Sequence, residues 1–382
     1  IDLRDFGWAR GEQWYELMRS YPYGLTYAQH PDAELKGLQD DLIDLSACDQ
    51  PLLRADWFVA TATRPPLYHT LLKLPETVAE LERELGVADM ADHFLNPKPE
   101  RISRAGFIRS GVSGQNRLVE RHESRHGAYW KSYDFQAGSP RSKLTRFPLG
   151  PLDLFPPGKH PYPLQAFRHD GGEMIFHLPN GLQAYLLTDG EGNRIDAGPI
   201  EVVSDALKTS GTPAIVNGVS CMACHRHGMI DFQDSIREGS AVFGVAENLI
   251  KRLYPTQKVM DRLVESDRQR FLSALDQAVS PFLRTGENMN RPLKELAEPV
   301  GEVARLHRLV YLDLQTIACE LDIEDPQEIL RKVGEKRLKQ LGLESLIRAE
   351  GVIGRLEWEA IDSVSLMQEL ARELRATPWR QL

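Results

Sequence analysis

The sequence predicts an α+β fold that is mainly helical, with an antiparallel β meander in the middle of the chain. Three observations support this prediction. Apolar residues recur at helical spacing near the start of the chain and again in its second half. Between them, runs rich in aromatic and β-branched residues alternate with turn signals. With 382 residues, of which 42% are hydrophobic, the chain is long enough to bury one large core or several smaller ones.

Residues 1–110 are expected to form an N-terminal helical region. The clearest helix lies between Leu74 and Leu85, where the pattern begins at a proline and ends before a glycine. Val78 and Leu81 fall on one face of this helix together with Leu85. This spacing is typical of an amphipathic helix that packs against a core.

Residues 111–205 are expected to form an antiparallel β region packed with the helical region. Strands are predicted, in chain order, at residues 117–122, 127–135, 173–178, 182–187 and 200–203. A proline-rich passage from 139 to 163 interrupts them as a long irregular loop. The Asn180-Gly181 pair is a hairpin signal between two of the strands. The pattern therefore predicts a twisted meander.

Helices return in the last two regions, at residues 206–300 and 301–382. Apolar residues repeat at helical spacing from Val259 to Leu275, and again from Leu306 to Ile317. Residues 325–382 add two or three amphipathic helices. The chain has no internal repeat and no low-complexity tract, so we expect four consecutive regions.

The run Cys221-Met222-Ala223-Cys224-His225 is the most informative motif in the chain. A C-x-x-C-H pentapeptide is the attachment signature of a c-type haem. Its two thiols bind the two vinyl groups of the haem, and the adjacent imidazole binds the iron as the proximal ligand. The motif predicts one covalent haem c, and residues 206–300 are expected to be a cytochrome c-like helical region around it.

Two other interpretations of the C-x-x-C pair stay open. A zinc site completed by His225 and His227 would crowd all four ligands into the segment from Cys221 to His227. Zinc sites usually separate their two ligand pairs so that the chain can fold around the metal. A thioredoxin-like redox pair needs the strand-to-helix junction of a βαβ unit, whereas this motif follows a loop. Both interpretations are therefore weaker than covalent haem.

The function of such a haem depends on the sixth coordination position of its iron. Met289 is a candidate distal ligand because it lies in a loop between two predicted helices, an order similar to that of small class I cytochromes c. His122, in the β region, is the alternative ligand. A filled sixth position predicts periplasmic electron transfer, and we expect this function for the chain.

An open sixth position would instead predict a peroxidase-like enzyme or a sensor of gases and other small ligands. His122 and Glu173 are then the candidate catalytic residues, because peroxide turnover needs a base near the bound substrate. A simple electron carrier needs only about a hundred residues, and this chain is several times longer. The sequence leaves the choice open.

Charge and hydropathy restrict the partners. The formal net charge of −9 and the lack of a lysine or arginine cluster argue against nucleic acid. A redox protein is the expected partner, and the acidic surface would suit a basic one. No run of about 18 apolar residues occurs, so no transmembrane segment is expected.

The expected location is the periplasm or another extracytoplasmic compartment. Covalent haem attachment in bacteria takes place outside the cytoplasmic membrane. The chain opens with Ile1-Asp2-Leu3-Arg4, as a mature product without its signal peptide would. In such a compartment Cys48 and Cys319 could form a disulfide, although two isolated buried thiols are an equal alternative.

Several phrases of the sequence resemble a family of large, exported bacterial monohaem c-type cytochromes over residues 50–320. The phrases are Val119-Glu120-Arg121-His122, Gly127-Ala128-Tyr129-Trp130-Lys131-Ser132-Tyr133-Asp134-Phe135, His169-Asp170-Gly171-Gly172-Glu173, Leu178-Pro179-Asn180-Gly181-Leu182-Gln183-Ala184-Tyr185 and Asn217-Gly218-Val219-Ser220-Cys221-Met222-Ala223-Cys224-His225. The resemblance implies covalent haem through Cys221 and Cys224 with His225 as ligand, and it supplies no established reaction. The phrases around His122 and His169 lie outside an ordinary cytochrome c fold. They imply that the strand region covers or modifies the haem site.

Overall fold

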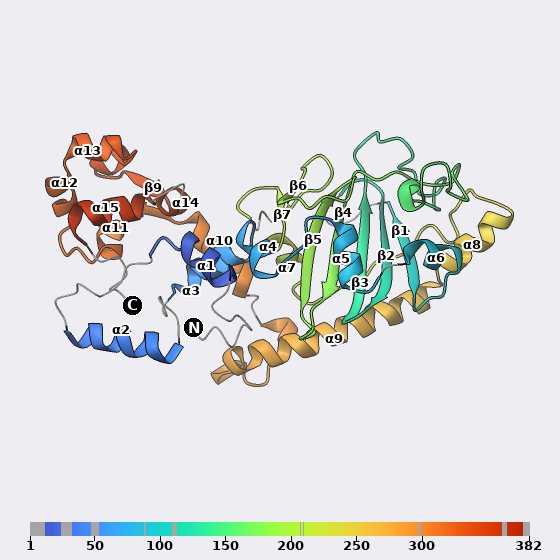
Figure 1. Cartoon of the computed structure of the whole chain (residues 1–382), viewed down its shortest axis with the longest axis horizontal. Helices are drawn as coiled ribbons and strands as arrows, with labels where there is room; N and C mark the ends of the chain where they lie inside the picture. Colours follow the sequence, from blue (N-terminus) through green and yellow to red (C-terminus); the bar gives the residue numbers. More distant parts are fainter. Residues whose placement is uncertain are drawn as a thin grey trace. The chain divides into compact units, whose positions relative to one another are not determined.

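The computed structural model describes residues 12–23, 33–46, 53–87, 89–108, 113–206, 208, 210–296, 299–360 and 365–376. It confirms the α+β fold, because the chain combines many helices with a five-stranded antiparallel sheet (Figure 1). Among the helices in these ranges, none has both the length and the apolar character needed to cross a lipid bilayer.

The chain divides into two compact units. One, called the terminal unit here, contains residues 1–63 and 302–382; the other, called the sheet unit, contains residues 64–301. The expected β region at 111–205 and the expected haem region at 206–300 both belong to the sheet unit. The sheet unit therefore holds every residue of the C-x-x-C-H motif.

The sheet is the meander that the sequence predicts. Its strands are β1 (Ile102–Phe107), β2 (Arg117–Ser124), β3 (Gly127–Asp134), β4 (Gly171–His177) and β5 (Gln183–Asp189). They are paired in the order β1-β2-β3-β4-β5, and every neighbour is antiparallel. The proline-rich loop between β3 and β4 contains only a 3-10 turn, η3 (Leu152–Leu154).

Two local expectations were wrong. Strand β1 lies inside the range expected to be helical. Its six residues carry a weak local pattern, and pairing with β2 from Ile102↔His122 to Phe107↔Arg117 decides their conformation. Residues 200–203 form a turn rather than a strand, because the N–H groups of Val202 and Val203 both donate to the carbonyl of Pro199 (2.9 and 3.0 Å). Short strands β6 (Ala197–Gly198) and β7 (Ile215–Val216) pair nearby.

Helices flank the sheet before and after it in the chain. Before it come α4 (Leu67–Leu71), α5 (Val78–Glu84) and α6 (Met90–Leu95); after it come α7 (Val219–Cys224), α8 (Val245–Leu253), α9 (Gln257–Leu283) and the 3-10 turns η4 (Gly286–Asn288) and η5 (Leu293–Glu295). The predicted helix at 74–85 begins only at Val78, because Thr77 and Glu80 form a capping box.

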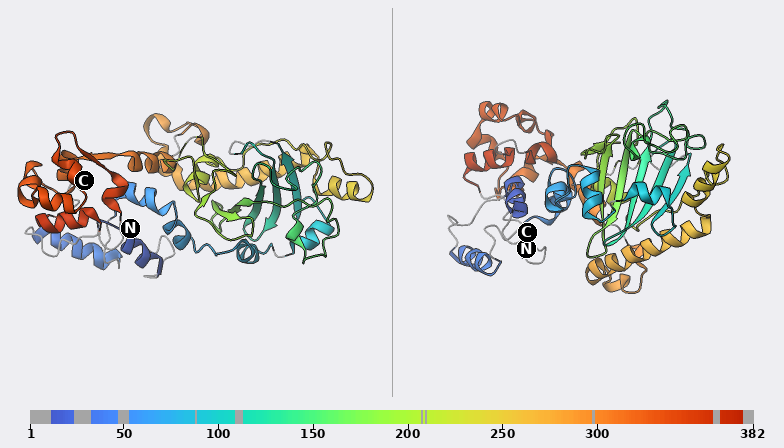
Figure 2. Two further views of the ribbon diagram at one scale, coloured as in Figure 1. Left: turned by 90° about the horizontal axis from the view of Figure 1, so that it is seen from above. Right: turned by 45° about the vertical axis from the view of Figure 1, so that its right-hand side comes forward.

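The two faces of the sheet bury different helices. Val119, Trp130 and Ile175 belong to the face that packs against α7 and α9, which we call the motif face. The opposite face carries Tyr129 and Met174 and packs against α5 and its neighbours. Figure 1 and Figure 2 show α5 over the strands and the long helix α9 running along the sheet. Because side chains alternate along a strand, this assignment shows which candidate residues of the strands face α7 and which face away from it.

The described part of the terminal unit is helical apart from two short strands, far apart in the chain, that pair antiparallel. Its elements are α1 (Glu12–Ser20), α2 (Ala33–Ser46), α3 (Ala55–Ala62), all but the first residues of α10 (Pro299–Leu309), β8 (Tyr311–Asp313), α11 (Leu314–Glu320), α12 (Gln327–Val333), α13 (Glu335–Gln340), η6 (Glu344–Ile347), β9 (Val352–Gly354), α14 (Arg355–Glu359) and α15 (Leu366–Leu374). Buried polar contacts join its early and late segments. His307 lies between Asp56 (3.2 Å) and Glu359 (3.0 Å).

Candidate functional site

The C-x-x-C-H motif lies on α7, a helix of less than two turns that follows Gly218. Gly218 adopts φ +87°, a conformation that residues with a Cβ rarely take, and this lets the chain turn from β7 into α7. The helical spacing brings Cys221 and Cys224 to one side of α7. The N–H of His225 donates to the carbonyl of Cys221 (2.8 Å), so the imidazole follows the two thiols on the same side.

The tautomer of His225 is set by its neighbour three residues on. The Nδ1 atom of His225 lies 3.3 Å from the carbonyl oxygen of Gly228, which can only accept a hydrogen bond. Nδ1 therefore carries the proton, and Nε2 keeps its lone pair. Burial lowers the pKa of His225, which also favours the neutral ring. Gly228 adopts φ +85°, so the turn that supplies this carbonyl needs glycine.

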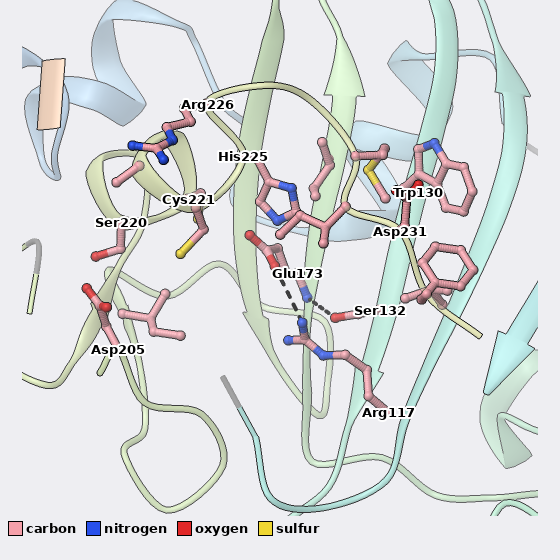
Figure 3. Close-up of a pocket in the computed structure, with 18 of the residues that line it drawn as sticks. Arg117, Trp130, Ser132, Glu173, Asp205, Ser220, Cys221, His225, Arg226 and Asp231 are labelled. Carbon is pink, nitrogen blue, oxygen red and sulfur yellow. Dashed lines mark hydrogen bonds and ion pairs between the residues drawn. The ribbon is translucent and has the colours of Figure 1, made fainter. Parts of the chain in front are cut away.

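A cavity of about 710 Å³ opens between α7 and the motif face of the sheet (Figure 3). Both motif thiols and the His225 imidazole line it. Much of the remaining wall is apolar and includes Phe107, Val119, Trp130, Ile175, Ile215, Met229, Ile230 and Phe232. Its volume lies within the range of about 300–1,000 Å³ that is typical of cofactor and ligand pockets.

One wall of the cavity is polar and comes from three strands. The Arg117 guanidinium is held by Asp134, with its Nη2 atom 2.9 Å from Oδ2. Its Nη1 atom lies 3.9 Å from the Glu173 carboxylate, and these two side chains are only 11% and 12% exposed. The Ser132 hydroxyl accepts the Glu173 N–H (2.9 Å). Figure 3 shows Glu173 between His225 and Arg117. A fixed cation and a carboxylate therefore face the motif.

Behind the motif, the ring of Tyr185 on β5 lies against the ring of His225, with centroids 6.1 Å apart. Tyr185 is itself fixed through its backbone. The Tyr68 hydroxyl accepts the Tyr185 N–H (2.9 Å) and donates to its carbonyl (3.2 Å). Strand β5 thereby supports the imidazole from the sheet.

The free thiols are poor nucleophiles in this setting. Burial raises the pKa of Cys221 well above its ordinary value, and the Glu173 charge adds to the effect. Burial also raises the pKa of Cys224 to about 11. A thioredoxin-like pair needs a stabilised thiolate, so this electrostatic setting disfavours that chemistry. Among the described residues, no group of three or more His, Cys, Asp or Glu side chains is placed to hold a metal ion.

The structure brings Glu173 to the cavity but places His122 elsewhere. In the sheet, His122 on β2 pairs with Tyr129 on β3, and Tyr129 pairs with Phe176 on β4. Phe176 lies three residues after Glu173 on the same strand. Paired residues share a face and successive residues alternate, so His122 and Glu173 lie on opposite faces of the sheet. His122 is buried there, with Nε2 2.9 Å from Glu120.

The other sequence candidates lie apart from the cavity wall. Met289 directly follows η4 and is 59% exposed. His169 packs edge-on against Tyr133, with ring centroids 5.1 Å apart. Cys48 lies outside the described residues, and Cys319 is partly buried on α11. The ligand assignment of Met289 and the pairing of the two cysteines stay predictions.

Sequence reasoning missed Arg117 and Asp134 as parts of one site. Arg117 and Asp134 stand at the two ends of the β2–β3 hairpin and are register partners. In the sequence, the only sign of this pairing is that the two residues lie equally far along the chain on either side of the turn between β2 and β3. A scan against protein-family models, a search of curated proteins and a search of solved structures found no match to this chain.

Proposed function

We propose that this protein is a monohaem c-type cytochrome that transfers electrons, with Cys221 and Cys224 as covalent anchors and His225 as the proximal ligand. The observation that carries the proposal is the meeting of all three side chains at one cavity of about 710 Å³. The sequence motif alone requires only that they be close in the chain. Their common exposure to a single large apolar cavity is what a covalently attached macrocycle needs.

The surroundings of the motif fit the same group. Apolar side chains from five strands would cover the flat faces of a haem and exclude water. The contact of His225 with the Gly228 carbonyl leaves Nε2 as the metal-binding nitrogen, an arrangement that orients histidine ligands in metal sites. When bound, a haem supplies an iron that accepts and returns one electron. Arg226 also lines the cavity and is suited to pair with a propionate.

Location and partner follow from this proposal. A covalent haem c is attached outside the cytoplasmic membrane, so the proposed compartment is the periplasm or another extracytoplasmic space. The partner is a redox protein, and the net charge of −9 favours one with a basic docking surface. The resemblance to exported monohaem cytochromes points to the same compartment.

A second candidate function is a peroxidase-like enzyme or ligand sensor with an open sixth position. The observation that favours it is the polar wall of the cavity. With an open sixth position, Glu173 would serve as the base and Arg117 as the fixed positive charge that peroxide turnover needs. Asp134 holds the Arg117 guanidinium in place.

The deciding experiment begins with export of the chain together with a haem-maturation system. We expect a covalently bound chromophore with a c-type ferrous spectrum, which Cys221→Ala and Cys224→Ala should each weaken. Cys319→Ala is the matched control and should leave haem content unchanged. A chain purified without covalent haem would refute the proposal.

Carbon monoxide then separates the two functions. If a side chain fills the sixth position, the ferrous spectrum should change little when the gas is added. High-spin ferric features and rapid carbon monoxide binding would favour the open site. In that case Glu173→Gln should reduce peroxide turnover while covalent haem is retained.

A further inference from the structure

One segment of the sheet unit carries an excess of positive charge. Residues 139–168, between β3 and β4, contain five lysine and arginine residues but only one acidic residue, Asp153, in a chain whose formal net charge is −9. The basic residues stand singly in the sequence, at Arg141, Lys143, Arg146, Lys159 and Arg168. We call residues 139–168 the basic segment. Its charge is opposite in sign to that of the chain as a whole.

Three of these cations lie close together without a carboxylate partner. The guanidinium carbons of Arg141 and Arg146 lie 4.9 and 5.4 Å from the centre of the Phe147 ring. The Arg141 Nε atom donates to the Ala166 carbonyl (2.7 Å), which keeps its charge uncompensated. Lys143 and Arg146 are exposed, and among the described residues no carboxylate pairs with any of the three cations. Their charge is therefore available to an anionic partner.

The segment that leads into α8 lies against the basic segment. The N–H of Ala241 donates to the carbonyl of Thr145 (2.8 Å), between Lys143 and Arg146 in the chain. Both segments also pack on one core, to which the basic segment contributes Leu144 and the other segment Val242. Figure 1 shows α8, in yellow, beside the β1 edge of the sheet. The two segments therefore form one continuous surface.

Two apolar side chains project from this surface. Phe243 and Val245 are 81% and 80% exposed, whereas Val242 and Ala246 on either side of them are buried in the core. Gly244 has a φ of +78°, which lets the chain turn between the two exposed residues. The buried neighbours fix the backbone, so Phe243 and Val245 are held outward. We call Arg141, Lys143, Arg146, Phe243 and Val245 together the loop surface.

We propose that the loop surface docks on the interface of a lipid membrane that carries anionic headgroups. Lys143 and Arg146 would lie at the level of the lipid phosphates. Phe243 and Val245 would enter the boundary between the headgroups and the acyl chains. The strength of such peripheral binding depends on the apolar area that is buried and on attraction to anionic lipids. The loop surface supplies both contributions.

The arrangement favours a membrane over an acidic protein as the partner. A protein interface needs a complementary packed surface around each apolar side chain, and charged residues are depleted from its core. A membrane needs no such match, because it accepts projecting apolar side chains while long basic side chains reach the headgroups. In the loop surface, cations and apolar side chains project side by side, as membrane binding requires.

Few acidic groups oppose this binding. Around the start of α8, Glu238 and Glu247 are paired with Arg237 (3.3 Å) and Lys251 (2.7 Å). None of the five residues of the loop surface lines the cavity at the C-x-x-C-H motif. The proposal goes beyond electron transfer and does not depend on haem, so either proposal can fail without the other.

The test measures cosedimentation of the full chain with lipid vesicles. Vesicles of equal parts phosphatidylglycerol and phosphatidylcholine should bind the chain, and vesicles of phosphatidylcholine alone should bind it much more weakly. Lys143→Gln combined with Arg146→Gln should weaken anionic vesicle binding about 25-fold, because each cation near the membrane contributes about fivefold. Arg83→Gln combined with Lys294→Gln removes the same charge elsewhere in the sheet unit and should change binding little.

A second pair of variants tests the apolar contribution. Phe243→Ala should weaken binding about tenfold, since the ring loses its burial in the membrane interface. Phe243→Trp should retain binding, because tryptophan is well suited to that interface. Phe282→Ala is the matched control: Phe282 is 78% exposed but lies at the opposite end of α9 from α8, and its loss should leave binding unchanged.

Three outcomes would overturn the proposal. The first is equal binding to neutral and anionic vesicles, because the cations would then have no role. The second is unchanged vesicle binding by Phe243→Ala. The third is binding of soluble poly-glutamate as tight as that of anionic vesicles, which would indicate an acidic protein as the partner of the loop surface.

Discussion

The buried carboxylate of Asp267 should be one of the most important side chains for the stability of the sheet unit. It lies in the middle of α9, is 4% exposed, and accepts two hydrogen bonds from the Arg121 guanidinium (2.7 and 2.9 Å). A third comes from the indole N–H of Trp130 (2.9 Å). These contacts attach α9 to the motif face, and Trp130 is also a wall of the large cavity.

Asp267→Ala leaves the buried Arg121 charge and the Trp130 donor without their acceptor. Breaking a buried ion pair from one side costs about 3–5 kcal/mol, and leaving a neutral donor unsatisfied costs about 1–3 kcal/mol. The two costs overlap because one carboxylate serves both partners. We therefore expect the free energy of unfolding to fall by about 4 kcal/mol, a large part of the stability of an ordinary domain.

Urea unfolding followed by circular dichroism measures this loss. Glu247→Ala removes one partner of the exposed Glu247–Lys251 pair (2.7 Å) and is the control, with an expected effect below about 0.5 kcal/mol. Adding Arg121→Met to Asp267→Ala should restore part of the stability, because the unpaired buried charge is removed as well. A loss below about 1 kcal/mol for Asp267→Ala would refute the reasoning.

Three further predictions concern other parts of the chain. Gly228→Ala should destabilise the sheet unit by about 1–3 kcal/mol, because Gly228 has a φ of +85° and an added Cβ would lie 3.2 Å from Phe271. The variant should also carry less covalent haem, measured as haem absorbance per chain. A normal haem content would contradict the role of the Gly228 carbonyl. Met289 stays the predicted sixth ligand, so Met289→Ala should remove a long-wavelength sulfur-to-iron band from the ferric spectrum; an unchanged spectrum would exclude Met289, which is 59% exposed, as that ligand. Burial opposes protonation of His307, but its hydrogen bonds to Asp56 and Glu359 raise its pKa above the ordinary 6.5. The His307 contribution to stability should therefore be complete below pH 6.5 and lost as the pH rises through the raised value, and in thermal unfolding His307→Gln should flatten this dependence.

The local sequence pattern was sufficient to predict most strands of the sheet. Strands β2 to β5 appear in the sequence as short aromatic and β-branched runs separated by turn signals, and the structure pairs them as a meander. The local pattern did not predict β1, whose residues form a strand because they pair with the edge of β2. The turn at 200–203 was misread for a related reason: two N–H groups donate to the Pro199 carbonyl, which no alternation of residue types reveals.

The candidate site divides in the same way. By itself the sequence determined the positions of Cys221, Cys224 and His225, because their chemistry depends on a spacing of five consecutive residues. Only the tertiary structure decided what faces them. Sheet register turns Glu173 and Arg117 toward the motif and His122 away from it, although all three lie in strands that the sequence predicts. Which face a strand residue occupies depends on the pairing and packing of the whole sheet, and that information is spread over residues far apart in the chain.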